Sequence, residues 1–249
     1  MSEYRLYDVF ARLYDEHWAQ GYLADAREGL ERYFVPRIPA GGRVLDVCCG
    51  SGRIVRWFAD QGFEAIGVDG SEAMIELARR NAPESEFHAA DVRDFRLDRP
   101  ADAALSTFDS INHMETIAEV AQVFRNVSRS LVPGGWFCFD VNTDEGFRAN
   151  DDEEYVSVDK TRAAIVRSRY DPRLELGKSE VTLFERESEG DCWRRSDTVI
   201  PEYCHPTAAL LEALEASGFE GPAILTADGD WKMPLGEGRL FFIAAKAGG

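Results

Sequence analysis

Short apolar runs alternate with longer segments of helical periodicity along most of the chain. The clearest case lies between residues 43 and 70. There, the segment 44–52 begins as an apolar run and ends in a glycine turn, residues 53–61 carry apolar side chains at helical spacing, and a second apolar run at 65–68 ends in an aspartate. Short apolar runs are typical of buried strands, whereas apolar residues three and four positions apart are typical of helices. This order predicts a parallel β-α-β unit.

The same alternation continues on both sides of this unit. We expect helices at 4–34, ahead of the unit, and at 71–81, 116–131 and 207–217. Further strands of the same sheet are expected at 87–90, 101–107, 136–141, 221–225 and 240–245, the last two as an antiparallel pair. Capping residues and turn formers stand at several boundaries, as at Ser71, Pro133 and Gly218. The chain should therefore form an α/β fold with a seven-stranded, mostly parallel, doubly wound sheet and helices on both faces.

A different pattern begins after residue 150, where polar and apolar residues alternate. We predict strands at 155–159, 163–170, 178–186 and 192–200, joined in part by turns at Asp171-Pro172 and Glu189-Gly190. These strands would form an antiparallel β insertion after the fifth strand of the main sheet. The chain then divides into residues 1–40 ahead of the sheet, a core at 41–150, the insertion at 151–203, and a segment 204–249 that completes the core sheet.

Composition narrows the class of protein. The chain has 249 residues, 45% of them apolar, which is enough for a sizeable core. Acidic residues outnumber basic ones by 45 to 28, giving a formal net charge of −17. Because a nucleic-acid binder needs a basic surface, a DNA or RNA partner is disfavoured and a small-molecule substrate is expected. The chain has neither a long apolar run nor a signal-peptide pattern at its start, so we expect a cytoplasmic protein that does not enter membranes.

Cysteines and histidines show no metal-binding pattern. The five cysteines form no C-x-x-C pair, and the four histidines do not lie at the spacing of metal ligands. We therefore predict neither a disulfide framework nor a metal site. Cys48 and Cys49 are adjacent, and small size beside a bound ligand explains them better than redox chemistry does.

The glycine turn of the β-α-β unit is the first candidate for a binding site. Gly50 and Gly52 lack a Cβ atom, so a ligand can lie directly against the backbone. Asp69, at the end of the next strand, is placed to accept hydrogen bonds from two ribose hydroxyls. Val55 stands where a dinucleotide-binding G-x-G-x-x-G motif has its third glycine. S-adenosylmethionine (SAM), which has no pyrophosphate, fits this pattern better than a dinucleotide does.

Several segments together resemble one known family. Asp46, Gly50 and Gly52 match the first motif, D-x-x-x-G-x-G, of the Rossmann-like class I SAM-dependent methyltransferases. The resemblance continues through segments 67–71, 88–95, 106–114 and 131–140. It covers most of the chain, and the central half is more specific than either end. The resemblance implies SAM as the methyl donor and S-adenosylhomocysteine as a product.

The resemblance also implies roles in cofactor binding. Residues 7–15 resemble a Y-x-x-F-A-x-x-Y-D segment that forms a lid over the cofactor, in which the Tyr14 hydroxyl reaches the methionyl carboxylate or the substrate. Met74 would pack against the adenine, Asp91 would accept from its exocyclic amine, and the amide of Val92 would reach a ring nitrogen. As alternatives, Met74 is a plain core residue and Asp91 a helix cap. The full set of expected contacts is Tyr14, Asp46, Cys48, Gly50, Gly52, Asp69, Gly70, Met74, Asp91, Val92 and Phe108.

The segment after the fourth strand is the expected acceptor loop. Residues 108–114, F-D-S-I-N-H-M, resemble the corresponding segment of amino-sugar N,N-dimethyltransferases and of relatives of glycine N-methyltransferase. Imidazole titrates near neutrality, so His113 is the candidate to take or relay the proton of the attacking group, unless it merely caps the next helix. The other expected substrate contacts are Trp18, Asp109, Asn112 and Asn142. In related enzymes the antiparallel sheet covers the active site or forms a dimer contact, so a homodimer remains open.

These residues leave more than one function open. The resemblance favours methyl transfer to an amine nitrogen of a small molecule. An O-methyltransferase, a SAM-binding protein without catalytic activity, and a nicotinamide-dependent oxidoreductase are the alternatives. A nicotinamide enzyme would share Asp69 but would not need Asp91 or the segment 109–113.

Overall fold

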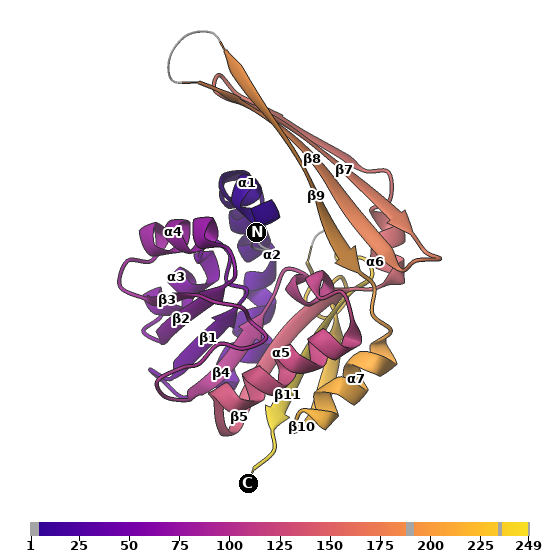
Figure 1. Ribbon diagram of the computed structural model, residues 1–249. Helices are drawn as coiled ribbons and strands as arrows, with labels where there is room; N and C mark the ends of the chain where they lie inside the picture. Colours follow the sequence, from indigo (N-terminus) through magenta and orange to yellow (C-terminus); the bar gives the residue numbers. More distant parts are fainter. Residues whose placement is uncertain (1–4, 188–191, 234–235, 249) are drawn as a thin grey trace.

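The computed structural model describes residues 5–187, 192–233 and 236–248, and two β-sheets form its framework (Figure 1). The larger sheet contains β1 (Arg43–Val47), β2 (Glu64–Asp69), β3 (Glu86–Ala89), β4 (Ala101–Ser106), β5 (Leu131–Asn142), β10 (Phe219–Thr226) and β11 (Arg239–Lys246). Their spatial order is β10-β11-β5-β4-β1-β2-β3. Strands β1 to β5 are parallel, and β11 runs antiparallel to both β5 and β10. The predicted seven-stranded, mostly parallel sheet is therefore confirmed.

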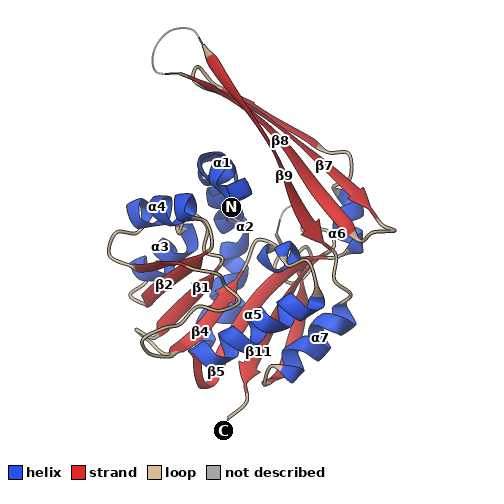
Figure 2. Ribbon diagram, viewed as in Figure 1, coloured by secondary structure: helices blue, strands red, loops and turns tan. Residues whose placement is uncertain are grey.

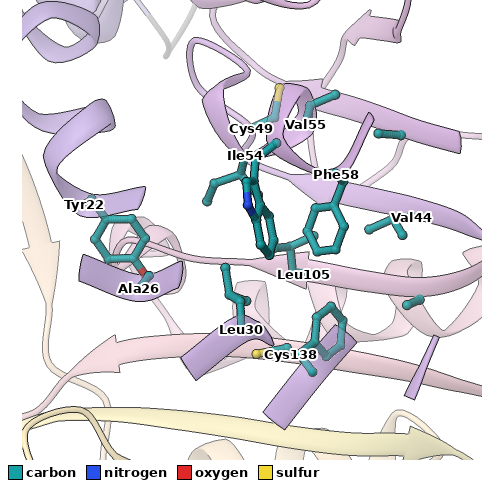
Figure 3. Packing of buried hydrophobic residues seen from close by; sticks show 14 of the residues in the cluster. Tyr22, Ala26, Leu30, Val44, Cys49, Ile54, Val55, Phe58, Leu105 and Cys138 are labelled. Atoms are coloured by element: carbon teal, nitrogen blue, oxygen red, sulfur yellow. The ribbon is translucent and has the colours of Figure 1, made fainter. Parts of the chain in front are cut away.

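Helices cover both faces of this sheet (Figure 2). On one face lie α2 (Gln20–Gly29), α3 (Arg53–Asp60) and α4 (Glu72–Asn81), and on the other lie α5 (Ile117–Ser130) and α7 (Thr207–Ala216). Figure 3 shows the first face, where Leu30 and Phe58 are buried with Val44 and Leu105 of the central strands. Because both faces of the parallel strands are covered, the strands read as continuous apolar runs in the sequence.

The N-terminal helices bridge the two sheets. Helix α1 (Arg5–Tyr14) continues through a π-helical turn at Asp15–Ala19 into α2, which is followed by a second π-helical turn at Leu30–Phe34 and a 3-10 turn at Val35–Arg37. Leu13 of α1 is buried with Ala164, Val181 and Ile200 of the second sheet. Helix α1 therefore packs its apolar side under that sheet.

Local interactions explain why several predicted boundaries hold. The Ser71 hydroxyl accepts from the backbone N–H of Met74 at 3.2 Å and caps α4. Thr116 and Glu119 form a reciprocal capping box at the start of α5. Strand β5 begins at Leu131 rather than at the predicted residue 136, because residues 132–135 form an irregularity within the strand instead of a separate turn.

The second sheet is the predicted antiparallel insertion. It contains β6 (Glu154–Val158), β7 (Arg162–Asp171), β8 (Leu176–Arg186) and β9 (Trp193–Tyr203), in the order β6-β7-β8-β9. Strands β7, β8 and β9 extend well beyond the core sheet (Figure 1). The turn predicted at Asp171-Pro172 joins β7 to β8, whereas the one predicted at Glu189-Gly190 lies outside the described residues.

Two short helical segments were not predicted. Helix α6 (Asp144–Ala149) follows β5, and a 3-10 turn, η4 (Ser110–His113), lies within the acceptor loop. Phe147 of α6 stacks on Tyr170 of β7 with ring centroids 5.1 Å apart, so a tertiary contact supports this helix. Within the described ranges, the chain has no helix long and apolar enough to cross a membrane.

Candidate functional site

A cavity of about 530 Å³ lies at the carboxyl edge of the core sheet. Its wall includes Cys48, Asp69, Val92, Phe108 and Asn142, each of which ends or follows one of the five parallel strands. The N-terminal helices and strands β7, β8 and β9 complete the wall. The cavity therefore lies where open α/β sheets bind their ligands, and the second sheet covers it.

Most of the residues that the sequence singled out line this cavity. They are Tyr14, Trp18, Cys48, Gly50, Asp69, Gly70, Met74, Val92, Phe108, Asp109, His113 and Asn142. The other predicted site residues, Asp46, Gly52, Asp91 and Asn112, are not among the described residues of its wall. The fold thus brings the glycine turn and the acceptor loop to one space.

Each of two glycines in the turn allows a different helix to approach the backbone closely. Gly50 has a φ of 50°, and a Cβ atom there would lie 2.9 Å from Cε1 of Tyr14. Gly52 has a φ of 74°, and a Cβ atom there would lie 2.8 Å from the Cβ of Ala78 in α4. Gly50 therefore admits the N-terminal helix, whereas Gly52 admits α4.

Asp69 connects the end of β2 to this turn. Its Oδ2 accepts from the backbone N–H of Gly50 at 2.9 Å, and its Oδ1 accepts from that of Ser71 at 2.9 Å. Burial raises the pKa of the Asp69 carboxyl, and the hydrogen bonds from backbone N–H groups oppose this rise. The carboxylate is thus held in one orientation at the cavity wall.

A smaller cavity of about 20 Å³ shares Tyr14, Cys48 and Phe108 with the larger one. Its wall also contains the acidic residue Asp46 and the basic residue Arg53. Burial, and after it the charge of Asp69, raises the pKa of Asp46 well above its usual range. A cationic group bound here would offset both effects.

A partly buried ion pair fastens the N-terminal helices to the glycine turn. Asp15 accepts from Nε and Nη2 of Arg53 at 2.7 and 2.9 Å, and from Nδ2 of Asn81 at 3.0 Å. Burial raises the pKa of Asp15, but the hydrogen bonds and the charge of Arg53 outweigh it, so the net pKa is lowered. Because Tyr14 precedes Asp15 in the chain, this pair holds the backbone of Tyr14 close to the glycine turn.

Aromatic rings form the wall on the side of the N-terminal helices. The ring of Tyr14 lies 5.7 Å from that of Phe108 and 6.0 Å from that of Phe10, and Phe10 stacks on Trp18 at 5.2 Å. Burial, followed by the charges of nearby aspartates, raises the pKa of Tyr14 well above its usual range. The Tyr14 hydroxyl therefore stays protonated at neutral pH and can donate a hydrogen bond.

The ring of His113 is oriented by the second sheet. Its Nδ1 lies 3.1 Å from the carbonyl oxygen of Pro201 in β9. A carbonyl only accepts, so Nδ1 carries the hydrogen and Nε2 of the neutral ring has a free lone pair. Burial lowers the pKa of His113, although the charge of Asp109 opposes this. His113 is therefore a neutral proton acceptor at physiological pH.

The side-chain amide of Asn112 forms hydrogen bonds with backbone groups through both its nitrogen and its oxygen. Its Nδ2 donates to the carbonyls of Asn142 and Tyr203 at 3.0 and 2.9 Å, and its Oδ1 accepts from the N–H of Asn142 at 2.9 Å. The side chain thus joins the acceptor loop to the ends of β5 and β9. Asn112 positions the loop and does not face the cavity.

Asp109 belongs to a cluster of charged groups beneath the acceptor loop. It accepts from Nδ2 of Asn142 at 2.7 Å and pairs with Arg239 at 3.3 Å. Arg239 also pairs with Asp140, which accepts from the Tyr22 hydroxyl at 3.3 Å. Burial raises the pKa of Asp140 to about 6, with Arg239 opposing the rise. Arg239 therefore links strand β11 to the acceptor loop.

Asp91 lies just outside the cavity and is held by its own neighbour. It accepts from the backbone N–H of Arg93 at 2.9 Å and from its Nη2 at 2.8 Å. Arg93 in turn donates to Glu119 at 2.6 Å. This network fixes the backbone on either side of Val92, which does line the cavity.

Comparison with known proteins points to one family. The family described as Methyltransferase domain matches residues 44–135. The Bacillus subtilis (strain 168) protein named "Putative methyltransferase YqeM" is 28% identical over 97% of this chain and 98% of its own length. The dTDP-4-amino-2,3,4,6-tetradeoxy-D-glucose N,N-dimethyltransferase of Saccharopolyspora spinosa is 35% identical over 50% of this chain and 51% of that enzyme.

Solved structures share the whole fold. A SAM-dependent methyltransferase from Clostridium acetobutylicum ATCC 824 has a TM-score of 0.77 at 18% identity, covering 97% of this chain and 99% of that one. The sugar N-methyltransferase KedS8 from Streptoalloteichus sp ATCC 53650 has a TM-score of 0.74 at 26% identity, covering 97% and 92%. Residues 44–135 of the chain match a methyltransferase domain, and the chain has the fold of SAM-dependent methyltransferases. The predictions of the Rossmann-like methyltransferase fold and of SAM as the cofactor are confirmed, and the nicotinamide alternative is wrong.

Three charged residues near the candidate site were missed from the sequence. Arg53 directly follows the glycine turn, and that position at the start of a helix was a usable indication. Glu202 and Arg239 come from strands far along the chain, and only the fold brings them near Asp109.

Within the residues that the structure describes, no group of three or more His, Cys, Asp or Glu side chains is arranged to hold a metal ion.

Proposed function

We propose that this methyltransferase transfers the methyl group of SAM to an amine nitrogen of a small molecule. The observation that supports this best is that two groups of residues line the same cavity. Gly50 and Asp69 form one part of its wall, and Asp109 and His113 form another. Its volume of about 530 Å³ suits a small-molecule site. The relative from Saccharopolyspora spinosa is named for N,N-dimethylation of an amino sugar, and KedS8 is a sugar N-methyltransferase.

The walls of the two cavities together offer a suitable partner for each part of SAM. Asp69 would accept from the ribose hydroxyls, and Met74 and Val92 offer an apolar surface for the adenine. The buried Asp46 carboxylate would hold the ammonium group, and the Tyr14 hydroxyl would donate to the methionyl carboxylate. Bound SAM supplies a methyl group that is activated by the positive charge on sulfur.

The remaining predicted cofactor residues fall into two groups. Cys48, Gly50, Gly70 and Phe108 line the cavity, which supports direct contact with the cofactor. Gly52 and Asp91 act indirectly, since Gly52 admits α4 and Asp91 fixes the backbone beside Val92 through Arg93. We therefore propose positioning roles for these two residues in place of direct contacts.

The N-terminal helices and the insertion together cover the acceptor. Trp18 lies 4.9 Å from the ring of Tyr155 on β6, and the Tyr155 hydroxyl lies 3.0 Å from Nδ1 of His17. These contacts support two roles for the predicted segments. Segment 1–40 would form a lid, and segment 151–203 would form a cover over the acceptor. The segments 41–150 and 204–249 would then form the catalytic core.

Catalysis combines orientation with removal of one proton. Holding the acceptor in line with the methyl group and excluding water contributes up to about 7–11 kcal/mol. An amine attacks only as the neutral base, so His113 takes its proton at Nε2, a step that adds a factor of about 10² to 10⁴ in rate. Asp109 and Asn142 line the same part of the cavity and orient the acceptor.

A screen with methyl-labelled SAM tests the proposed function. The protein is incubated with labelled SAM and a panel of amino sugars, simple amines and the matching alcohols, and product masses and methylation sites are determined. N-methylated products are expected. O-methylated products alone would make the protein an O-methyltransferase, and binding of S-adenosylhomocysteine without any transfer would make it a SAM-binding protein that lacks activity.

A further inference from the structure

Glu202 lies in the acceptor part of the cavity, on strand β9. Strand β9 is an edge strand of the second sheet, and the acceptor loop lies along its free edge (Figure 1). The carbonyls on either side of Glu202 both receive hydrogen bonds from this loop, Pro201 from His113 at 3.1 Å and Tyr203 from Asn112 at 2.9 Å. The backbone that carries Glu202 is therefore fixed to the loop that carries the proposed base.

The side chain of Glu202 lies on the inner face of the second sheet. Side chains alternate along a strand, so Glu202 shares a face with Ile200, which is 4% exposed and also lines the cavity. Opposite Glu202 on β8 stands Gly177, and the ring of Phe147 occupies the space that a side chain of Gly177 would take. Glu202 and Phe147 both line the cavity.

The surroundings of Glu202 hold more negative than positive charge. Its charged neighbours are Asp109 and Arg239, and Arg239 also pairs with Asp140. The carboxyl groups of Glu202, Asp109 and Asp140 therefore lie near one guanidinium group, that of Arg239. Burial, and after it the charge of Asp109, raises the pKa of Glu202, although Arg239 opposes this. An ammonium ion bound beside the carboxyl group would offset the rise and keep the group ionised. Among the described residues, Asp109 and Asp140 accept hydrogen bonds through their carboxyl groups, whereas the Glu202 carboxyl accepts none.

We propose that Glu202 binds the acceptor nitrogen and makes the site select amines over alcohols. This role rests on the proposed function. As the nitrogen lone pair forms the N–C bond, the C–S bond breaks and its electron pair stays on sulfur, so positive charge moves from sulfur to nitrogen. A carboxylate beside the nitrogen stabilises this charge more in the transition state than in the neutral amine.

An alcohol meets the opposite effect at the same position. A hydroxyl develops negative charge as it loses its proton, and the carboxylate of Glu202 repels that charge. An amine arrives as an ammonium ion, is attracted by Glu202, and gives one proton to Nε2 of His113 before it attacks. Glu202 and His113 therefore act on the same nitrogen, one through charge and the other through the proton.

Kinetics of an amine acceptor found in the labelled-SAM screen test this role. Glu202→Gln is expected to lower kcat/KM by roughly 100-fold, with most of the loss in kcat and an unchanged affinity for S-adenosylhomocysteine. Glu202→Asp should recover part of the loss because it restores the charge. Glu180→Gln, at an exposed position of the neighbouring strand β8, is the matched control and should behave like the wild type. A Glu202→Gln enzyme with wild-type kinetics would overturn the role.

A binding measurement tests the proposed role of Glu202 without turnover. Cyclohexylammonium chloride and cyclohexanol are titrated into the protein saturated with S-adenosylhomocysteine, and their affinities are measured by ligand-observed NMR. The wild type should prefer the ammonium ion by roughly tenfold, and Glu202→Gln should lose this preference. A preference that survives in Glu202→Gln would overturn the role of Glu202 alone. Exclusive O-methylation in the screen would instead overturn the proposed function.

Discussion

One hydrogen bond gives His113 the tautomer that its proposed role as a base requires. The carbonyl of Pro201 holds Nδ1, and burial lowers the pKa of the ring, so Nε2 is free to accept a proton. We expect His113→Ala to lower kcat by about 10²- to 10⁴-fold. The affinity for S-adenosylhomocysteine should change little, because the residues proposed to hold it lie in another part of the wall. Steady-state kinetics and calorimetry measure the two quantities.

A second histidine variant controls for loss of an imidazole in general. His88 lies on β3, where its ring pairs with Glu86 at 2.7 Å and does not line the cavity. His88→Ala should therefore leave turnover unchanged. Unimpaired turnover of His113→Ala at saturating acceptor would remove the proposed base role.

Two glycines separate the effects of backbone conformation and of close packing. Gly52 and Gly62 both have a positive φ, 74° and 85°. An added Cβ would meet nothing within 4 Å at Gly62, whereas at Gly52 it would lie 2.8 Å from the Cβ of Ala78. Gly62→Ala should lower the free energy of unfolding by about 1–2 kcal/mol. Gly52→Ala should cost about 1–3 kcal/mol more in urea unfolding, and equal losses would mean that α4 moves aside freely.

Among the elements, α1 is tied to the glycine turn by the ion pair between Arg53 and Asp15, the residue that follows the helix. Asp15 is 8% exposed and holds Arg53 at 2.7 Å. Asp15→Asn weakens this contact and frees Tyr14, so the dissociation constant of S-adenosylhomocysteine should rise roughly tenfold. Amide hydrogen exchange of residues 5–19 should become faster. Calorimetry and exchange mass spectrometry check the two effects.

An exposed ion pair in the next helix gives the comparison. Arg27 and Glu31 lie 2.8 Å apart, with side chains 59% and 44% exposed. Exposed pairs contribute little, so Glu31→Gln should leave both the affinity and the exchange rates near those of the wild type. Equal behaviour of Asp15→Asn and Glu31→Gln would mean that α1 is held by apolar packing alone.

Elements with local causes could be predicted from the sequence, whereas those with tertiary causes could not. The β-α-β unit follows from apolar runs and a glycine turn that lie within 30 residues. Helix α6 is only six residues long, and the stacking of Phe147 on Tyr170 supports it. Such a contact between distant segments leaves no periodic pattern.

The candidate site likewise has a part that could be predicted from the sequence and a part that only the fold reveals. The part of the cavity wall around the glycine turn was largely predictable, because its residues follow parallel strands and occur in motifs. Asn112 was expected to contact the substrate, but it joins the ends of β5 and β9, which its sequence position does not reveal. Arg239 reaches Asp109 from 130 positions away. Charge partners of this kind follow from strand order, and they become visible only once the sheet is assembled.

Across the whole molecule, Asp140 joins parts that are far apart in the chain. It is fully buried on β5, pairs with Arg239 of β11, accepts from Tyr22 of α2, and accepts from the backbone N–H of Asp109 at 3.2 Å. The core sheet, the N-terminal helices and the acceptor loop thus meet at one carboxyl group. Its protonation should therefore affect the stability of the fold as a unit.

The sign of this effect follows from the pKa. Burial raises the pKa of Asp140 from its ordinary value to about 6, so the folded state binds the proton more tightly than the unfolded state does. The resulting stabilisation is present below about pH 4 and is lost as the pH rises through about 6. Its size is up to about 3 kcal/mol, since one pKa unit corresponds to about 1.4 kcal/mol.

Asp140→Asn removes this titration and so tests it. The variant should be less stable than the wild type at pH 4.5, because it lacks the carboxyl group that binds a proton more tightly in the folded state. The difference in the free energy of unfolding should shrink by about 2 kcal/mol between pH 4.5 and 7.5, measured by urea unfolding. Asp94→Asn, whose side chain is 79% exposed, provides the baseline. A difference that stays constant with pH would show that Asp140 is ionised throughout and that Arg239 fully compensates its burial.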